Sequence, residues 1–142
     1  MEYDGEIIER LFADIAKKRR ILENYRDMTR EEFDSDPGRI MAVEHGFQTM
    51  IQAAIDIGLH LLTCMGVNGI ETYSDVFDLL GKEGVLDCEF ASKIRGMAGF
   101  RNILVHGYTK VDEELVRYYL KEHLVDFSEF ETLIRKYLES AK

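Results

Sequence analysis

An arginine, an asparagine, a histidine and a tyrosine interrupt one otherwise apolar run, residues 99–108 (GFRNILVHGY). Ionisable side chains are rarely buried without partners, so we expect Arg101 and His106 to contact counter-charges, line a cleft or lie between subunits. A histidine titrates near neutral pH and can transfer a proton, whereas an arginine stays charged and binds phosphate through paired hydrogen bonds. Together, the two residue types suit cleavage of a phosphodiester.

In such a reaction, His106 would act on the ribose 2′-hydroxyl or on the leaving oxygen, and Arg101 would stabilise the charge of a phosphorane-like transition state. Asn102 is separated from His106 by one helical turn and shares its face, so it could orient the histidine or hold a ribose hydroxyl. This chemistry requires no metal and no other cofactor.

The spacing of the pair raises a geometric problem. On an ideal helix, His106 is rotated by roughly 140° from Arg101, so one helix does not stack the two side chains. Either the long arginine reaches around the helix end, or a second copy of the segment completes the site. The commoner structural alternative is that acidic neighbours within one bundle satisfy both side chains.

The composition is that of an ordinary globular protein and fits one domain, residues 1–142, with 46% hydrophobic and 32% charged residues. The net charge of −9 argues against a general nucleic-acid binder, and we expect no DNA partner. Residues 17–20 (KKRR) are basic, but we interpret them as the solvated face of a helix. We find no secretory signal and no run long enough to span a membrane, which favours the cytoplasm and no membrane partner. Cys64 and Cys88 are expected to be free thiols.

Apolar residues recur at helical spacing along most of the chain, and no segment alternates for long with the period of a strand. We therefore predict an all-α fold, an up-and-down bundle of four or five main helices. Capping signals at Thr29 and Asp36 predict a short extra turn and then the start of a long helix. The helices are expected at residues 6–27, 37–65, 72–82 and 87–107, with one more after Asp112 and the last starting at Asp126 or Ser128.

A polar ribbon follows the second predicted helix at four-residue steps. Its members are Glu44, Gln48, Gln52, Asp56 and His60. The ribbon either is a half-exposed face, with Asp56 and His60 as a surface pair, or faces the site and supplies a carboxylate that orients or neutralises Arg101. In the second case, Gln48, Asp56 and His60 are supporting polar residues. Asp56 and His60 also have metal-ligand spacing, but the sequence offers no third ligand, and we expect no metal site.

Residues 100–108 (FRNILVHGY) resemble the signature of HEPN-domain proteins, specifically the HepT-like toxin subfamily: Arg, four residues, His, any residue, Tyr. The resemblance extends from about Ile40 to Leu138. Further similar residues lie at positions 42–44, 48, 53–60, 72–73, 77–80 and 111–112.

The resemblance implies a homodimer in which two copies of the motif face each other and form a composite ribonuclease site for tRNA or mRNA. Arg101 and His106 would be the catalytic pair, and Asn102 a supporting polar group. Tyr108 takes the place of the tyrosine that an MntA-like nucleotidyltransferase antitoxin modifies with AMP in this family. We thus expect a metal-independent endoribonuclease toxin that leaves a 2′,3′-cyclic phosphate.

The main alternative is a non-catalytic HEPN-type interaction module that binds a nucleotide or a nucleotidyltransferase partner. The two interpretations differ in one observable, which is RNA cleavage by the isolated chain.

Overall fold

The computed structural model describes residues 1–107 and 111–141, and within them every regular element is a helix. The predicted all-α class is therefore confirmed. None of the helices in the described ranges is both long and apolar enough to cross a membrane. The elements are α1 (Gly5–Glu23), α2 (Arg30–Ser35), α3 (Pro37–Cys64), α4 (Tyr73–Lys82), α5 (Cys88–Ile94), α6 (Gly96–His106), α7 (Glu113–Glu122) and α8 (Asp126–Ser140).

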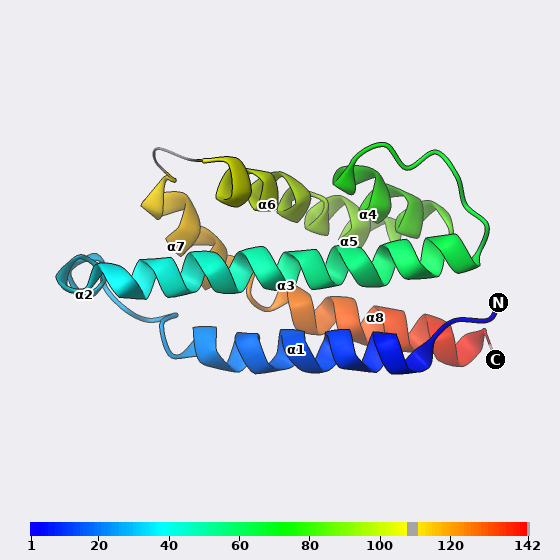
Figure 1. The fold of residues 1–142 in the computed structure, drawn as a ribbon, viewed down its shortest axis with the longest axis horizontal. Helices are drawn as coiled ribbons and strands as arrows, with labels where there is room; N and C mark the ends of the chain where they lie inside the picture. The colour runs from blue at the N-terminus through cyan, green and yellow to red at the C-terminus, as the bar shows by residue number, and fades with distance from the viewer. Residues whose placement is uncertain (108–110, 142) are drawn as a thin grey trace.

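The long helix α3 is the axis of the bundle. Helices α1 and α8 lie along one side of it, and α4, α5 and α6 lie along the other (Figure 1). Helices α2 and α7 lie at the end where α3 begins, and both chain termini lie at the opposite end. Buried residues surround most of the circumference of α3, as its continuous apolar pattern predicts.

Capping side chains fix the helix starts that the sequence predicts. Thr29 and Glu32 form a capping box at α2, and the Asp36 carboxylate accepts a hydrogen bond from the backbone N–H of Gly38 in the first turn of α3. Thr72 begins α4 with a second capping box, and Asp112 caps α7. Each cap satisfies backbone N–H groups that have no partner inside the helix, and each is worth about 1 kcal/mol.

The helix predicted to run unbroken from Asp87 is divided at Arg95. The N–H of Ala98 donates to the Arg95 carbonyl at 3.2 Å, three residues back, which interrupts the regular four-residue pattern. Two tertiary contacts hold the junction: Arg95 Nε donates to Asp78 at 3.0 Å, and the Tyr119 hydroxyl donates to the Gly96 carbonyl at 3.3 Å. Helix α6, which carries Arg101, is consequently a separate element that packs against its neighbours independently of α5.

Aromatic packing in the core fixes how α6 is rotated. Phe100 lies 5.6 Å from Phe47 on α3 between ring centroids, and it stacks on Tyr119 of α7 at 3.9 Å. Phe47 also contacts Phe127 of α8, at 6.2 Å. Because Phe100 is buried in this cluster, its neighbour Arg101 must lie at the edge of the core.

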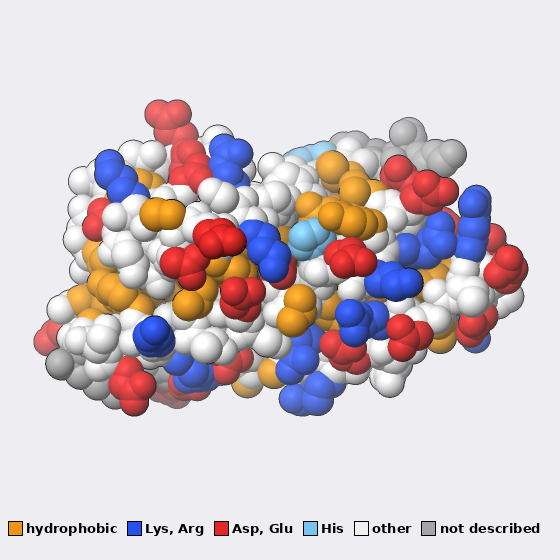
Figure 2. All heavy atoms as spheres, turned by 180° about the vertical axis from the view of Figure 1, so that it is seen from behind, with side chains coloured by type: hydrophobic (Ala, Val, Ile, Leu, Met, Phe, Trp, Pro, Cys, Tyr) orange, Lys and Arg blue, Asp and Glu red, His pale blue; other side chains and the backbone are white. Residues whose placement is uncertain are grey.

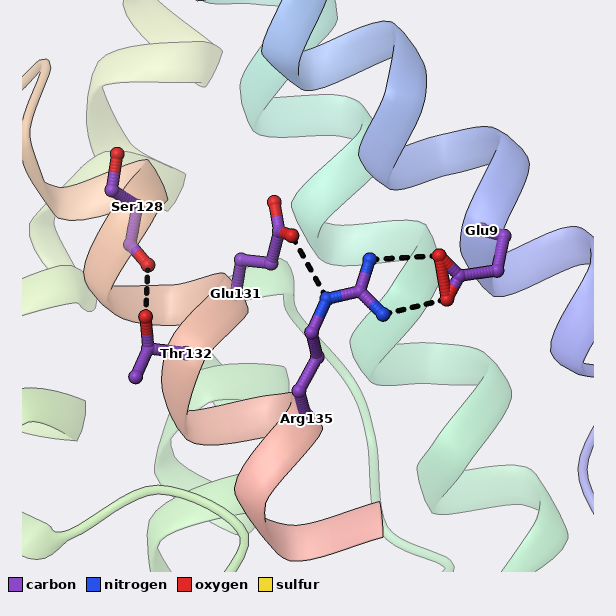
Figure 3. A network of polar contacts seen from close by, with 5 residues as sticks. All are labelled: Glu9, Ser128, Glu131, Thr132 and Arg135. Carbon is purple, nitrogen blue, oxygen red and sulfur yellow. Dashed lines mark hydrogen bonds and ion pairs between the residues drawn. The ribbon is translucent and has the colours of Figure 1, made fainter. Parts of the chain in front are cut away.

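Helices α1 and α8 are joined by one arginine. Arg135 donates two hydrogen bonds to the Glu9 carboxylate, at 2.6 and 2.7 Å, and a third to Glu131 at 2.8 Å (Figure 3). Its guanidinium also lies over the Phe12 ring, 4.9 Å from the centroid. The negative partners raise the pKa of Arg135, and its hydrogen bonds lower the pKa of Glu9.

Cys64 and Cys88 are free thiols, as the sequence predicts. Cys64 is half-buried and Cys88 is exposed.

Candidate functional site

Among the described residues, one stripe of α6 is exposed to solvent. Gly99, Asn102, Ile103 and His106 are all exposed, and their spacing of three and four residues places them on one helix face. Ile103 keeps 43% of its surface exposed. The opposite face of α6, with Met97, Ala98 and Phe100, packs into the core. The expectation that Asn102 and His106 share a face is confirmed.

Arg101 lies at the edge of this stripe, half-buried, and its partners are electrically neutral. Its Nε donates to Gln52 Oε1 at 3.1 Å, and its Nη1 donates to Asn102 Oδ1 at 3.2 Å. The guanidinium carbon lies 4.8 Å from the centre of the Tyr73 ring, in the geometry of a cation–π contact. Within the described ranges, no carboxylate forms an ion pair with Arg101.

The polar ribbon of α3 reaches Arg101 through Gln52. The Gln52 amide nitrogen donates to Asp56 Oδ1 at 2.9 Å, which turns the amide oxygen toward the arginine. Asp56 therefore orients Gln52 and does not touch Arg101. Sequence reasoning placed Gln52 in the ribbon but did not single it out. Its spacing of four residues from Asp56 could have indicated that the two side chains form a hydrogen bond.

His60 contacts a different part of the molecule. Its Nε2 accepts a hydrogen bond from the backbone N–H of Asp4 at 2.9 Å and lies 3.7 Å from Cys64 Sγ. His60 thus holds the start of α1, and Asp56 and His60 do not form a pair with each other. No group of three or more potential metal ligands occurs in the part of the chain that the structure describes.

Two further ribbon members, Gln48 and Glu44, form no hydrogen bond or ion pair with Arg101 in the described part of the chain. Gln48 is half-buried on α3, and no described residue hydrogen-bonds its side chain. Burial raises the pKa of the Glu44 carboxyl, and the negative charge of Glu113 on α7 raises it further. The beginning of the ribbon therefore faces α7.

His106 is the last residue of α6 and is exposed. Gly107 ends the helix with φ −79°, outside the left-handed conformation in which glycine commonly closes helices. Its N–H donates to the Ile103 carbonyl at 2.8 Å, and a Cβ at this position would lie 2.6 Å from that same oxygen. Glycine is required here for space. Tyr108, the predicted modification site, lies outside the described residues.

The chain is similar to one protein family over most of its length. The profile of the family described as "Ribonuclease HepT-like" matches residues 15–134.

Two relatives and one solved structure are informative. The tRNA nuclease HepT of Aphanizomenon flos-aquae is 32% identical over 95 residues, 67% of this chain and 65% of that protein. The mRNA nuclease HepT of Shewanella oneidensis is 28% identical over 88 residues, 62% of this chain and 66% of that protein. The matched segments thus span just under two thirds of these relatives. The fold is similar to that of the tri-AMPylated Shewanella oneidensis HEPN toxin in complex with MNT antitoxin, with a TM-score of 0.84, 25% identity, and coverage of 94% of this chain and 99% of that one.

Proposed function

This chain belongs to the HepT-like ribonuclease family, and on that premise we propose that it is a metal-independent endoribonuclease toxin under the control of a nucleotidyltransferase antitoxin. The observation that carries the proposal is the state of Arg101. Its guanidinium is oriented by two neutral amides and one aromatic ring, and no described carboxylate neutralises it. An arginine with a purely structural role would be expected to pair with a buried carboxylate. One that is held but not neutralised keeps its charge for a phosphate.

The proposed reaction is transesterification of RNA. The ribose 2′-oxygen attacks the adjacent phosphorus and loses its proton, and the bond to the 5′-oxygen breaks, which leaves a 2′,3′-cyclic phosphate and a 5′-hydroxyl. His106 takes the proton from the 2′-hydroxyl or supplies one to the leaving oxygen. Arg101 stabilises the negative charge on the non-bridging oxygens, and Asn102 positions the arginine or a ribose hydroxyl.

We propose a composite site between two copies of the chain. The exposed stripe of α6 carries an apolar side chain, Ile103, between the polar Asn102 and His106. A two-fold symmetric contact through this stripe would bury Ile103 and bring Arg101 of one copy toward His106 of the other. It would also remove the rotational mismatch between the two side chains within one helix.

We propose that the antitoxin acts at Tyr108, one residue beyond Gly107. The tyrosine oxygen would attack the α-phosphorus of ATP, lose its proton and displace pyrophosphate, which leaves an anionic AMP group on Tyr108. That group would compete with the RNA phosphate for the arginine. The similar Shewanella toxin, which is AMPylated and in complex with its antitoxin, supports this part of the proposal. We propose that this chain and its nucleotidyltransferase antitoxin act in the cytoplasm, where the RNA substrate is.

The test is RNA cleavage by the purified chain in excess EDTA. We expect cleavage with a 2′,3′-cyclic phosphate end, and a loss of at least about 1000-fold in kcat/KM for Arg101→Ala and for His106→Ala, as for removal of acid–base and charge-stabilising groups. His60→Ala is the matched control and should retain cleavage, because His60 contacts Asp4 at the start of α1.

Activity that survives Arg101→Ala or His106→Ala would exclude that residue from the mechanism. Loss of activity in EDTA would exclude metal independence. A well-folded dimer that binds its nucleotidyltransferase partner but cleaves no RNA would instead support the interaction module.

A further inference from the structure

One surface hollow is strongly positive in an acidic protein. The hollow has a volume of about 330 Å³ and lies between the α1–α2 connection and α7. We call it the basic hollow, defined by Arg26, Arg30, Arg117 and Lys121, with Asp27 as its single carboxylate. Four cations and one anion give it a formal charge of 4 − 1 = +3, in a chain of net charge −9.

The neighbouring hollow differs in sign, although the two share Arg30 and Arg117. Its other lining residues include three carboxylates, so its formal charge is 2 − 3 = −1. The positive charge is therefore local to the basic hollow.

The cations of the basic hollow are largely free of direct neutralisation. Arg26 donates from Nε and Nη2 to the backbone carbonyl of Lys121, at 3.3 and 3.1 Å, so a neutral acceptor holds its guanidinium in place. Within the described ranges, Arg117 and Lys121 form no ion pair. In the part of the chain that the structure describes, the ion pairs of Arg30 are two long contacts with exposed carboxylates, at 3.7 and 3.9 Å, which are worth little in water.

The arrangement suits an extended anion. Arg117 and Lys121 lie one turn apart on α7 and form one wall, whereas Arg26 and Arg30 come from the α1–α2 side. Arginine binds phosphate oxygens through parallel hydrogen bonds, and a hollow lined by one sign of charge raises the local potential. The lining also includes three apolar residues, Met28, Phe33 and Leu120.

The basic hollow lies at the same end of the molecule as the catalytic motif. The neighbouring hollow that shares Arg30 and Arg117 also contains Val111, and Val111 Cγ2 would lie 3.0 Å from a Cβ at Gly107, the residue after His106. Helices α2 and α7 and the end of α6 gather at this end (Figure 1). On the face seen in Figure 2, Lys and Arg side chains at this end are interspersed with Asp and Glu side chains.

We propose that the basic hollow binds the phosphate backbone of the RNA substrate, outside the phosphate that is cleaved. The proposal rests on the proposed function and accounts for how an acidic protein obtains affinity for RNA. A strand held at His106 must continue past it, and each further nucleotide brings one negative charge. The basic hollow offers four cations at the same end of the molecule, and three of them, Arg26, Arg117 and Lys121, form no ion pair within the described ranges. Cation–phosphate contacts of this kind dominate affinity for nucleic acids.

The experiment measures binding of a fluorescein-labelled single-stranded RNA of mixed sequence to the inactive His106→Ala chain. The test variant adds Arg117→Glu and Lys121→Glu. The matched control adds Lys82→Glu and Lys136→Glu, two exposed lysines near the opposite end, and makes the same change in net charge. We expect the test variant to bind RNA about tenfold more weakly than the parent chain, and the control variant to bind as the parent does. The slope of log affinity against log salt concentration should become shallower by about 0.7 for each phosphate contact that is lost.

Cleavage separates this proposal from the proposed function. In the active chain, the same test substitutions should lower kcat/KM about tenfold for long RNA but leave cleavage of the dinucleotide UpA unchanged, since UpA is too short to reach the hollow. Circular dichroism of the variants, and the neutral pair Arg117→Gln and Lys121→Gln, guard against a folding defect.

Equal binding by the test and control variants, or no RNA binding by the parent chain, would overturn the proposal. So would a test variant that binds RNA normally but no longer binds the nucleotidyltransferase, because the hollow would then be a protein-docking surface. If the chain cleaves no RNA but the test variant still loses RNA binding, the proposed function fails and the assignment of the hollow stands.

Discussion

The Nε–H of Arg101 donates to Gln52 Oε1 over 3.1 Å and so joins α6 to the long helix α3. The acceptor is an amide, and the nearest carboxylate in this chain of contacts, Asp56, binds the far side of that amide at 2.9 Å. The arginine is thereby oriented without losing its net charge. This is the arrangement expected of a group that stabilises negative charge in a transition state.

Changing the acceptor should test this relationship. Gln52→Ala removes one hydrogen bond to Arg101 and should lower kcat/KM for RNA roughly two- to tenfold, the effect of about 0.5–1.5 kcal/mol. Gln52→Glu should lower it further, because a carboxylate at this position would pair with the guanidinium. Steady-state cleavage measures both effects. If Gln52→Glu were as active as the parent chain, cleavage would not depend on an Arg101 that is free of a carboxylate partner.

The contact between Glu9 and Arg135 predicts a pH-dependent contribution to stability (Figure 3). Hydrogen bonds and charge from Arg135 lower the pKa of Glu9 in the folded state, so its stabilisation is present above the unfolded pKa and is lost as pH falls through the folded pKa. Glu9→Gln should therefore cost about 0.5–1 kcal/mol at neutral pH, as for a partly exposed bidentate pair, and little in acid.

Urea unfolding of Glu9→Gln at several pH values measures this contribution. Glu71→Gln is the matched control, because Glu71 is exposed and forms no ion pair within the described ranges, and it should change little at any pH. If Glu9→Gln lowered the free energy of unfolding as much in acid as at neutral pH, the loss would not come from the charged contact between Glu9 and Arg135.

Asp126 predicts a larger effect, because it is the one buried charged side chain in the described core. Its Oδ2 lies 2.8 Å from His123 Nδ1, and its Oδ1 lies 3.3 Å from Lys93 Nζ. Asp126→Ala leaves both partners without this carboxylate and should cost about 3 kcal/mol in the free energy of unfolding. Asp126→Asn keeps the volume and should cost less. Equal, small losses for both variants would show that the carboxylate contributes little.

The sequence predicts those features that depend on nearby residues. Capping boxes, the extent of α3 and the shared face of Asn102 and His106 all follow from spacings of three or four residues. The sequence does not predict which distant residues the polar ribbon contacts. Gln52 meets a residue 49 positions away and His60 one 56 positions away, and periodicity says nothing about which distant element covers which turn.

The break at Arg95 has the same origin. Local propensity favours one continuous helix through residues 88–106, but contacts from Asp78 on α4 and Tyr119 on α7 hold the junction. Tertiary contacts decide such interruptions, because a helix is only marginally favoured by its own sequence. The motif itself was visible, since an arginine and a histidine in an apolar run are unusual on burial grounds alone.

The most direct test of the central claim is complementation between two inactive chains. Arg101→Ala and His106→Ala proteins, carrying different affinity tags, are co-expressed, and the mixed dimer is isolated by tandem purification. If Arg101 of one copy works with His106 of the other, the mixed dimer has one intact site and should cleave RNA at about half the rate of the parent dimer. A mixed dimer that forms but remains as inactive as either variant alone would contradict the composite site.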